Sequence, residues 1–347
     1  MALADPATAP AERAILVVGP AWVGDMVLAQ ALFKRLKQHD PRVAIDVLAP
    51  SWTAPILDRM IEVRSVLASP FQHGELALRK RLQFARTLRG IGYQQAIVLP
   101  NSFKSALIPF FAGIPLRTGY RGEFRYGVLN DVRLLDKARL PRMVDRFVAL
   151  AGDAREAIVN PQLKTDRADQ ARTLDTLGIK KPGPVAALCI GAEYGPAKRW
   201  PAEHFASLIE LLSAQGWQCW LVGSAKDREM AAEIGRLGKV AALDLCGRTS
   251  LDQAVDVLAS ADVVIANDSG LMHVAAALNK PLIALYGSSS PAFTPPMSDH
   301  ASIMRRDIPC SPCFARECPL GHFKCMRELL PEAVAQAVLA AKSSAGV

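Results

Sequence analysis

One stretch of this sequence constrains the fold more than any other, because an apolar run, a polar turn and a helix-forming run follow one another directly. Residues 263–266 (VVIA) are apolar and mostly β-branched, and the run is short enough to be a buried strand of a parallel sheet. Residues 267–269 (NDS) favour the start of a helix, and Gly270 lets a ligand approach the backbone. With a helix at 271–278, the stretch predicts one strand–turn–helix unit of an α/β fold.

The same order of strand, polar loop and helix recurs in both halves of the chain. Buried strands are predicted at residues 14–18, 43–48, 95–99, 185–190, 217–222, 263–266 and 282–286. Helices are predicted at residues 26–38, 76–88, 168–177, 202–213, 251–259, 271–278 and 331–342. Such alternation is typical of doubly wound parallel sheets, in which the loops after the strands carry the ligand site.

The length of 347 residues suggests two domains. Proline and glycine at 181–184 (KPGP) follow a helix near the middle and mark the start of a second series of strands. We predict two Rossmann-like domains, 14–164 and 165–347, that face each other across a cleft. Residues 1–13 are rich in Ala and Pro and are predicted to be a disordered tail.

The same sequence argues against export and against a membrane span. Residues 1–13 lack the basic start and apolar core of a secretory signal. No apolar run reaches the ~18 residues that a membrane-spanning helix needs. We therefore expect the protein to be cytoplasmic.

Positive charge is concentrated in the first half. The formal net charge is +8; residues 1–164 hold 23 Lys and Arg against 14 Asp and Glu, whereas residues 165–347 hold 18 against 19. An anionic partner is therefore expected to meet the first half. Nucleic acid, anionic lipid and a phosphorylated substrate all fit this charge, and so does a basic surface without any partner.

Polar residues at helix starts are the first candidates for a site. A helix N-terminus presents free N–H groups, so residues 267–270 can bind an anion, and His273 could face it. An ordinary turn with a packed core histidine is the alternative. Asp25 is predicted to lie where a helix begins, where the dipole would keep its carboxylate ionised; an N-cap is the alternative. The preceding loop spaces its glycines as G-x4-G, unlike the G-x-G-x-x-G of dinucleotide-binding folds.

The seven cysteines fall into two groups. Cys189, Cys219 and Cys246 lie in apolar surroundings and are predicted to be buried thiols. The other four cluster near the end of the chain, with His322 among them: Cys310, Cys313, Cys318 and Cys325. The cluster could form a structural zinc site, although its spacing is not the paired C-x2-C…C-x2-C form. A cytoplasmic location argues against disulfides, so reduced thiols are the other interpretation.

Several segments, in order, resemble the lipopolysaccharide heptosyltransferases of glycosyltransferase family 9. They are 19–27 (GPAWVGDMV), 119–127 (GYRGEFRYG), 191–201 (GAEYGPAKRWP), 267–273 (NDSGLMH) and the cysteine-rich tail. The resemblance extends from Ile15 to about Leu330. It implies the GT-B architecture of two Rossmann-like domains. It also implies inverting transfer of a heptose from ADP-heptose to the first heptose of the lipopolysaccharide inner core, on a Kdo–lipid A acceptor, without a cofactor.

The resemblance also implies roles for matching residues. Asp25 would be the base that takes the proton of the acceptor hydroxyl, and Lys198 would balance the charge of the leaving diphosphate. The donor would be held by Asp227, Asp268, Ser269, Gly270, Leu271 and His273. The phosphates and carboxylates of the acceptor would meet Lys104, Arg121 and Arg125. The alternatives are a solvated lysine for Lys198, a helix cap for Asp227 and surface cations without a ligand for the last three.

No metal is expected at this site. The chain lacks the Asp-x-Asp triplet with which the other common glycosyltransferase architecture binds a metal and a diphosphate. The resembling enzymes carry the four clustered cysteines without a metal in their mechanism, so we favour reduced thiols over zinc. The acceptor lipid implies peripheral association with the cytoplasmic face of the inner membrane, and the basic helix at 76–88 is a candidate contact.

Three other functions compete with this hypothesis. The first is a heptosyltransferase of the same family that acts on another core position. The second is a nucleotide-sugar epimerase, for which the likeness would be architectural only. The third is a nucleic-acid-binding protein with a zinc module, against which the basic half shows no recognised nucleic-acid motif.

Overall fold

The computed structural model describes residues 13–344 except 72–73 and 153–155. The chain forms two compact units. Unit 1 comprises the described parts of Met1–Ala21, Ala31–Leu140 and Asp145–Val159, and unit 2 comprises Trp22–Gln30, Pro141–Val144 and the described part of Asn160–Val347. The predicted division placed Trp22–Gln30, Pro141–Val144 and residues 160–164 in the first domain, whereas the packing groups them with unit 2. The predicted tail lies outside the described residues except for Arg13.

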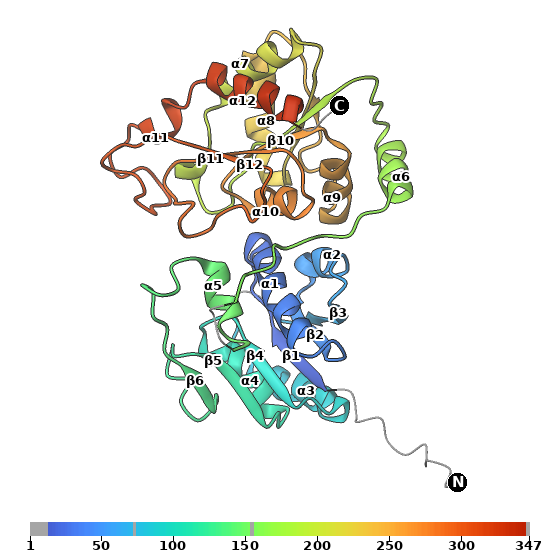
Figure 1. The fold of residues 1–347 in the computed structure, drawn as a ribbon, viewed down its shortest axis with the longest axis vertical. Helices are drawn as coiled ribbons and strands as arrows, with labels where there is room; N and C mark the ends of the chain where they lie inside the picture. Colours follow the sequence, from blue (N-terminus) through green and yellow to red (C-terminus); the bar gives the residue numbers. More distant parts are fainter. Residues whose placement is uncertain (1–12, 72–73, 153–155, 345–347) are drawn as a thin grey trace. The chain divides into compact units, whose positions relative to one another are not determined.

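Unit 1 is built on a sheet of six parallel strands in the order β3-β2-β1-β4-β5-β6 (Figure 1). The strands are β1 (Ala14–Val18), β2 (Ala44–Pro50), β3 (Val63–Ser69), β4 (Gln95–Val98), β5 (Leu116–Tyr120) and β6 (Asp131–Arg133). Every residue of β1 and β4 is buried, as expected for central strands with helices on both faces.

The helices of unit 1 follow the strands. They are α2 (Ala54–Leu57), α3 (Leu78–Leu88) and α4 (Phe103–Phe111), with 3-10 turns η1 (Ser51–Thr53) and η2 (Arg89–Ile91). Two further helices begin with residues of unit 2 and end with residues of unit 1: α1 (Val23–His39) and α5 (Met143–Val148). Buried residues of α3 and α4 pack on β1 and β4 to form the core of this unit.

Unit 2 has a second sheet of six parallel strands, in the order β12-β11-β10-β7-β8-β9. The strands are β7 (Val185–Cys189), β8 (Gln218–Val222), β9 (Leu243–Asp244), β10 (Val263–Asn267), β11 (Leu282–Tyr286) and β12 (Ala301–Arg305). Numbered within its own unit, each sheet has the order 3-2-1-4-5-6 of a doubly wound fold, so the predicted fold class is confirmed.

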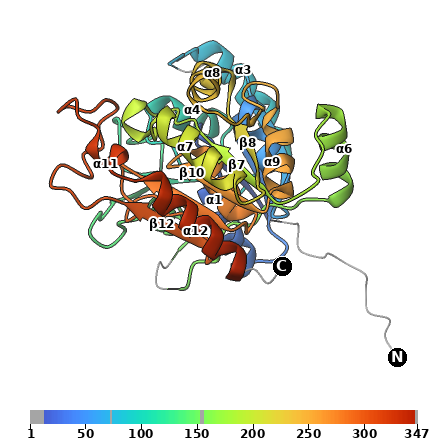
Figure 2. The same ribbon diagram turned by 90° about the horizontal axis from the view of Figure 1, so that it is seen from above.

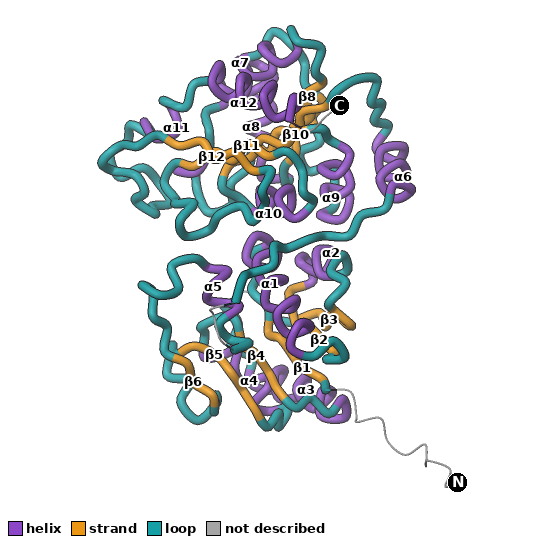
Figure 3. Tube along the Cα trace, viewed as in Figure 1, coloured by secondary structure: helices purple, strands orange, loops and turns teal. Residues whose placement is uncertain are grey.

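Helices surround the second sheet (Figure 3). They are α6 (Arg167–Leu177), α7 (Ala202–Ser213), α8 (Arg228–Leu237), α9 (Leu251–Ser260), α10 (Gly270–Ala277), α11 (Lys324–Arg327) and α12 (Pro331–Ser344), with 3-10 turns η3 (Pro196–Lys198) and η4 (Ala225–Asp227). Helix α7 packs beside both α8 and α12 (Figure 2). Among the described residues, every helix is too short or too polar to cross a lipid bilayer.

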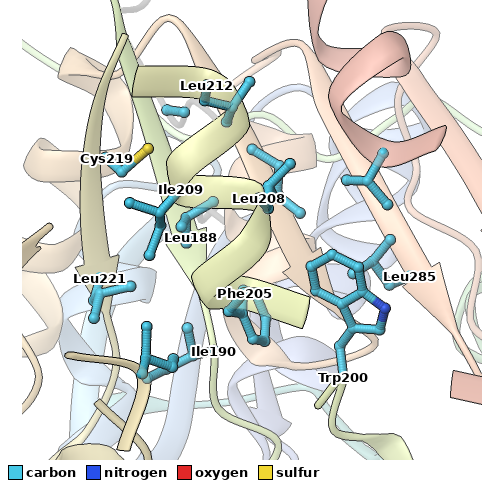
Figure 4. Close-up of a cluster of buried hydrophobic side chains, with 14 of the residues drawn as sticks. Leu188, Ile190, Trp200, Phe205, Leu208, Ile209, Leu212, Cys219, Leu221 and Leu285 are labelled. Atoms are coloured by element: carbon cyan, nitrogen blue, oxygen red, sulfur yellow. The ribbon is translucent and has the colours of Figure 1, made fainter. Parts of the chain in front are cut away.

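The central strands of unit 2 could be predicted from the sequence because their apolar side chains form its core. Apolar residues lie opposite one another on neighbouring strands: Leu188 of β7 is paired with Leu221 of β8 on one side and with Ile265 of β10 on the other. Leu188 and Leu221 lie beneath α7 with Phe205 and Ile209 of that helix (Figure 4). All these side chains are at least 98% buried. Burying a side chain of this size contributes about 1.5–3 kcal/mol, which fixes the register and therefore the positions of the loops that follow the strands.

Candidate active site

The candidate site lies where the strand order of unit 2 reverses, at the carboxyl ends of β7 and β10. Lys198 ends the turn η3 in the loop after β7, and Asp268 directly follows β10. Lys198 Nζ lies 2.6 Å from Asp268 Oδ2, and the two side chains are only 16% and 5% exposed. Ligands of doubly wound sheets bind at this switch point, so the geometry joins two residues that the sequence singled out separately.

Asn267, the last residue of β10, fixes the loops on either side of this ion pair. Its side chain is completely buried. Its Oδ1 accepts a hydrogen bond of 3.1 Å from the Trp200 N–H, and its Nδ2 donates to the Ile190 carbonyl at 2.9 Å. One buried amide therefore holds both the beginning and the end of the loop that carries Lys198. The sequence predicts Asn267 only as a residue at a helix start, and this structural role is not apparent from it.

Asp25 lies in the first turn of α1, in the part of that helix that belongs to unit 2. Burial raises its pKa from 3.8 to about 6; Lys198 opposes this shift and Asp268 adds to it. Desolvation therefore outweighs the expected effect of the helix dipole on this pKa, although the carboxylate is still mostly ionised at neutral pH. The N-cap alternative is also wrong, since α1 begins at Val23 and Asp25 is its third residue.

The first turn of α1 packs closely on the first turn of α10. A Cβ atom on Gly24 would lie 2.7 Å from Cδ2 of His273, and one on Gly270 would lie 3.0 Å from the Cβ of Val23. Glycine at both positions therefore permits the approach that brings Asp25 beside Lys198 and Asp268. This is a close contact of backbone and side chain, and no larger residue fits at Gly24 without a shift.

His273 is 5% exposed, and burial lowers its pKa to about 4. Its Nδ1 has no hydrogen-bond partner in the part of the chain that the structure describes. Ser269 is the N-cap of α10, but no described side chain caps the helix, so the first N–H groups, at Gly270 and Leu271, are available to an anion. The predicted donor segment thus contributes Asp268 to the ion pair and places the start of α10 next to it.

Asp227 has the geometry of the helix-cap alternative. Its Oδ2 accepts hydrogen bonds from the N–H and the hydroxyl of Ser224, each 2.8 Å long. Its Oδ1 lies 3.9 Å from the guanidinium of Arg199. The carboxylate also fills the space beside Gly191 and Gly223, where a Cβ atom would come within 3.0 Å of it. Contact with a ribose remains a prediction.

The acceptor-side candidates lie in unit 1, at the carboxyl ends of two adjacent strands. Lys104 is half-buried in the first turn of α4 after β4, and Arg121 is exposed directly after β5. The prediction for Arg125 needs correction, because its side chain is 1% exposed. Its guanidinium donates to the Pro100 and Tyr120 carbonyls and to Asn101 Oδ1, which holds the loop together.

The two groups of cysteines also differ in burial. Cys189, Cys219 and Cys246 are buried, as predicted, and burial raises the pKa of each thiol. The other four line one cavity together with His322: Cys310, Cys313, Cys318 and Cys325. Within the described ranges no three His, Cys, Asp or Glu side chains are placed to hold a metal ion. The choice of reduced thiols over zinc stays a prediction.

Comparison with known proteins decides the family. The model of glycosyltransferase family 9 (heptosyltransferase) matches residues 81–324. The chain belongs to this family. It is 48% identical over 309 residues to lipopolysaccharide heptosyltransferase 2 of Escherichia coli K12, covering 84% of this chain and 87% of that one. It is 44% identical over 351 residues to lipopolysaccharide heptosyltransferase 2 of Salmonella typhimurium, covering 96% and 99%.

A solved structure supports the same assignment. The structure of E. coli ADP-heptose lipopolysaccharide heptosyltransferase II has a TM-score of 0.87 and 42% identity, covering 96% of this chain and 99% of that one. This family 9 protein is therefore a glycosyltransferase with the predicted GT-B fold. The assignment leaves the epimerase and the nucleic-acid-binding alternatives without support.

Proposed function

We propose that this family 9 enzyme transfers a heptose from ADP-heptose to the first heptose of the lipopolysaccharide inner core, with inversion at the anomeric carbon. The observation that carries the proposal is the cluster of Asp25, Lys198 and Asp268 at the switch point of unit 2. It combines a carboxylate that can accept a proton with a cation that can face a diphosphate. The names of the similar enzymes favour the second core heptose as the product.

Asp25 is the proposed general base. As the acceptor hydroxyl oxygen attacks the anomeric carbon, its proton passes to the Asp25 carboxylate and the bond from that carbon to the diphosphate oxygen breaks. The products are the extended core and ADP. A base with a pKa of about 6 is mostly ionised at neutral pH and is more basic than an exposed aspartate, which suits this proton transfer.

Lys198 and the start of α10 are the proposed holders of the leaving diphosphate. The free N–H groups at Gly270 and Leu271 donate to its oxygens, and the Lys198 ammonium balances the charge that develops as the bond breaks. Asp268 acts through Lys198, because a carboxylate repels phosphate but holds the ammonium in place. Neutral His273 lines the same side, and Asp227 is the proposed partner of the ribose.

The acceptor is proposed to lie against the basic unit 1. Lys104 and Arg121 can contact its phosphates and carboxylates. Helix α3 presents exposed cations at Arg79, Lys80 and Arg86, and exposed Leu78 lies beside them. We propose that this surface associates with anionic lipid at the cytoplasmic face of the inner membrane, where each cation near the surface contributes about 1 kcal/mol.

The test measures ADP release from ADP-heptose with two acceptors, heptosyl-Kdo–lipid A and Kdo–lipid A without heptose. We expect turnover only with the heptosylated acceptor. Asp25→Ala should bind ADP normally but lower the rate of ADP formation by about 10²–10⁴. Turnover with the heptose-free acceptor would instead identify the enzyme that adds the first heptose. Normal binding of ADP with no turnover on either acceptor would refute the proposed function.

A further inference from the structure

Two cations lie within cation–π distance of the ring of one tyrosine beside the proposed diphosphate site. Tyr194 lies in the loop after β7, and the Nζ of Lys198 is 5.0 Å from its ring centroid. The guanidinium carbon of Arg316 is 5.2 Å from the same centroid. Arg316 comes from the cysteine-rich segment between β12 and α11, more than a hundred residues away. The predicted site residues included Lys198, as a catalytic residue, but neither Tyr194 nor Arg316.

Backbone contacts fix this arrangement. The Arg316 carbonyl accepts a hydrogen bond of 3.0 Å from the Ala197 N–H, next to Lys198. The Tyr194 hydroxyl donates to the Phe314 carbonyl at 2.8 Å. A Cβ atom on Gly195 would overlap the Arg316 carbonyl oxygen, so only glycine allows the two segments to come this close. Arg316 is therefore held beside Lys198 by the fold, and not by its side chain alone.

The segment that carries Arg316 is itself anchored to the next strand. The Phe314 N–H donates to the Ser288 carbonyl at 2.6 Å, and the Ser311 hydroxyl donates to the Gly287 carbonyl at 2.7 Å. Gly287 and Ser288 directly follow β11, the neighbour of β10 in the sheet. Three loops of the same sheet edge thus meet around Tyr194.

The two cations differ in how their charge is balanced. Lys198 is paired with Asp268. Arg316 is exposed, and no described carboxylate lies within ion-pair distance of it. Two cations near one ring repel each other, and an anion that contacts both removes that cost. The planar guanidinium is suited to bind two phosphate oxygens at once, and the cation–π contact with the ring stabilises its position.

We infer that Arg316 is a second cation for the diphosphate of the donor, and that Tyr194 is the residue that positions both cations. The inference rests on the proposed function and adds two residues to its site. A diphosphate gains negative charge as its bond to the heptose breaks, so a second cation on it stabilises the transition state and the bound ADP. Arg316 keeps its proton throughout, and no covalent step involves it.

Binding of ADP and AMP to Arg316→Gln tests this inference. We expect the affinity for ADP to fall about tenfold, the size of one lost charge-assisted hydrogen bond, while the affinity for AMP changes less than about twofold. Arg316→Lys should restore part of the difference. Arg306→Gln is the matched control, because Arg306 is an exposed arginine of the same segment whose nearest carboxylate, on Glu328, is 3.9 Å away. It should leave both affinities unchanged.

Variants of Tyr194 test its positioning role. Tyr194→Phe keeps the ring, whereas Tyr194→Leu removes it. We expect Tyr194→Leu to lower the affinity for ADP about as much as Arg316→Gln does, and Tyr194→Phe to lower it less. The double variant Arg316→Gln/Tyr194→Leu should lose less than the product of the two single losses, because both changes remove the same contact. Thermal unfolding of each variant confirms that the fold is intact.

Two outcomes would overturn the inference. One is an equal loss of affinity for ADP and AMP in Arg316→Gln, because such a loss would not depend on the diphosphate and would indicate a general effect on the fold. The other is unchanged ADP affinity with a raised KM for the acceptor, which assigns Arg316 to the acceptor. Because ADP binding needs no heptose transfer, a wild-type protein that prefers ADP over AMP but transfers no heptose refutes the proposed function and leaves the binding role of Arg316 intact.

Discussion

The two units share one strand order but hold charge at the carboxyl ends of their strands in opposite ways. In unit 2, Lys198 and Asp268 are nearly buried and paired at 2.6 Å. In unit 1, Arg121 is exposed and has no ion pair with any described residue. A buried pair fixes one small ligand in one orientation, whereas exposed cations attract a large anionic partner without fixing it. Burial, and not topology, separates the proposed donor side from the proposed acceptor side.

The largest effect is expected where unit 2 places its base. Asp25→Asn should lower kcat by about 10²–10⁴, because it removes proton transfer from the acceptor hydroxyl. Steady-state ADP release measures this loss, and ADP affinity serves as the control. A variant that keeps more than about a tenth of the wild-type rate would remove Asp25 from the mechanism.

The pH profile of the wild-type enzyme sharpens this assignment. Because the Asp25 carboxylate must be ionised to accept a proton, kcat should fall below about pH 6, the pKa to which burial raises it. His273, whose pKa is lowered to about 4, stays neutral across that range and does not contribute to the fall. Asp25→Asn should show no fall near pH 6 in its residual rate.

The next largest effect concerns two asparagines, one in each unit. Asn267→Ala leaves the Trp200 N–H and the Ile190 carbonyl buried without partners, which should lower the free energy of unfolding by about 2–4 kcal/mol. Asn130 of unit 1 makes an equivalent pair of bonds, to Arg117 N–H at 2.7 Å and to the Pro115 carbonyl at 2.6 Å, but it is exposed.

Asn130→Ala should therefore cost only about 1 kcal/mol, because water replaces the lost bonds. Urea unfolding of both variants measures the difference. Equal losses would show that burial does not decide the cost of losing such a pair of hydrogen bonds. Asn267→Ala should also raise the KM for ADP-heptose, since its loop carries Lys198, whereas Asn130→Ala should not.

The central strands were predictable because a strand that is buried on both faces of the sheet is a continuous apolar run in the sequence. The predicted 14–18 and 282–286 match β1 and β11 at both ends. Five of the described strands were missed. Four of them, β3, β6, β9 and β12, lie at the edges of their sheets and are partly or fully exposed, and the fifth, β5, is next to the edge strand β6. Edge strands are paired on one side only, so their sequences carry little apolar pattern.

The site was predictable one loop at a time. Lys198 and Asp268 each follow a strand, but their contact joins residues 70 positions apart and depends on which strands are neighbours. Arg125 was misassigned because its sequence context, rich in arginine and aromatic residues, does not reveal that its guanidinium is buried. Asn267 and Arg316 were missed because their partners lie far away in the sequence.

A smaller effect on stability should accompany the loss of activity in Asp25→Asn. The folded-state pKa of about 6 lies above the ordinary 3.8, so ionising Asp25 costs stability as pH rises through that interval. Asparagine avoids this cost. The variant should be more stable than wild type by about 1–3 kcal/mol at pH 7, and the gain should vanish below about pH 4. Unfolding in urea at both pH values measures it.

The smallest effect is expected at the exposed edge of unit 1, where two arginines four residues apart should behave oppositely. Arg121→Gln should raise the KM for the acceptor only about two- to fivefold, more at low salt than at high salt, and leave stability unchanged, because an exposed cation is well solvated. Arg125→Gln should instead lower the free energy of unfolding by about 1–3 kcal/mol, because it leaves the Pro100 and Tyr120 carbonyls without their donor. If Arg121→Gln destabilises the fold, or if Arg125→Gln changes only the acceptor KM, exposure does not mark the acceptor side and the contrast between the two units fails.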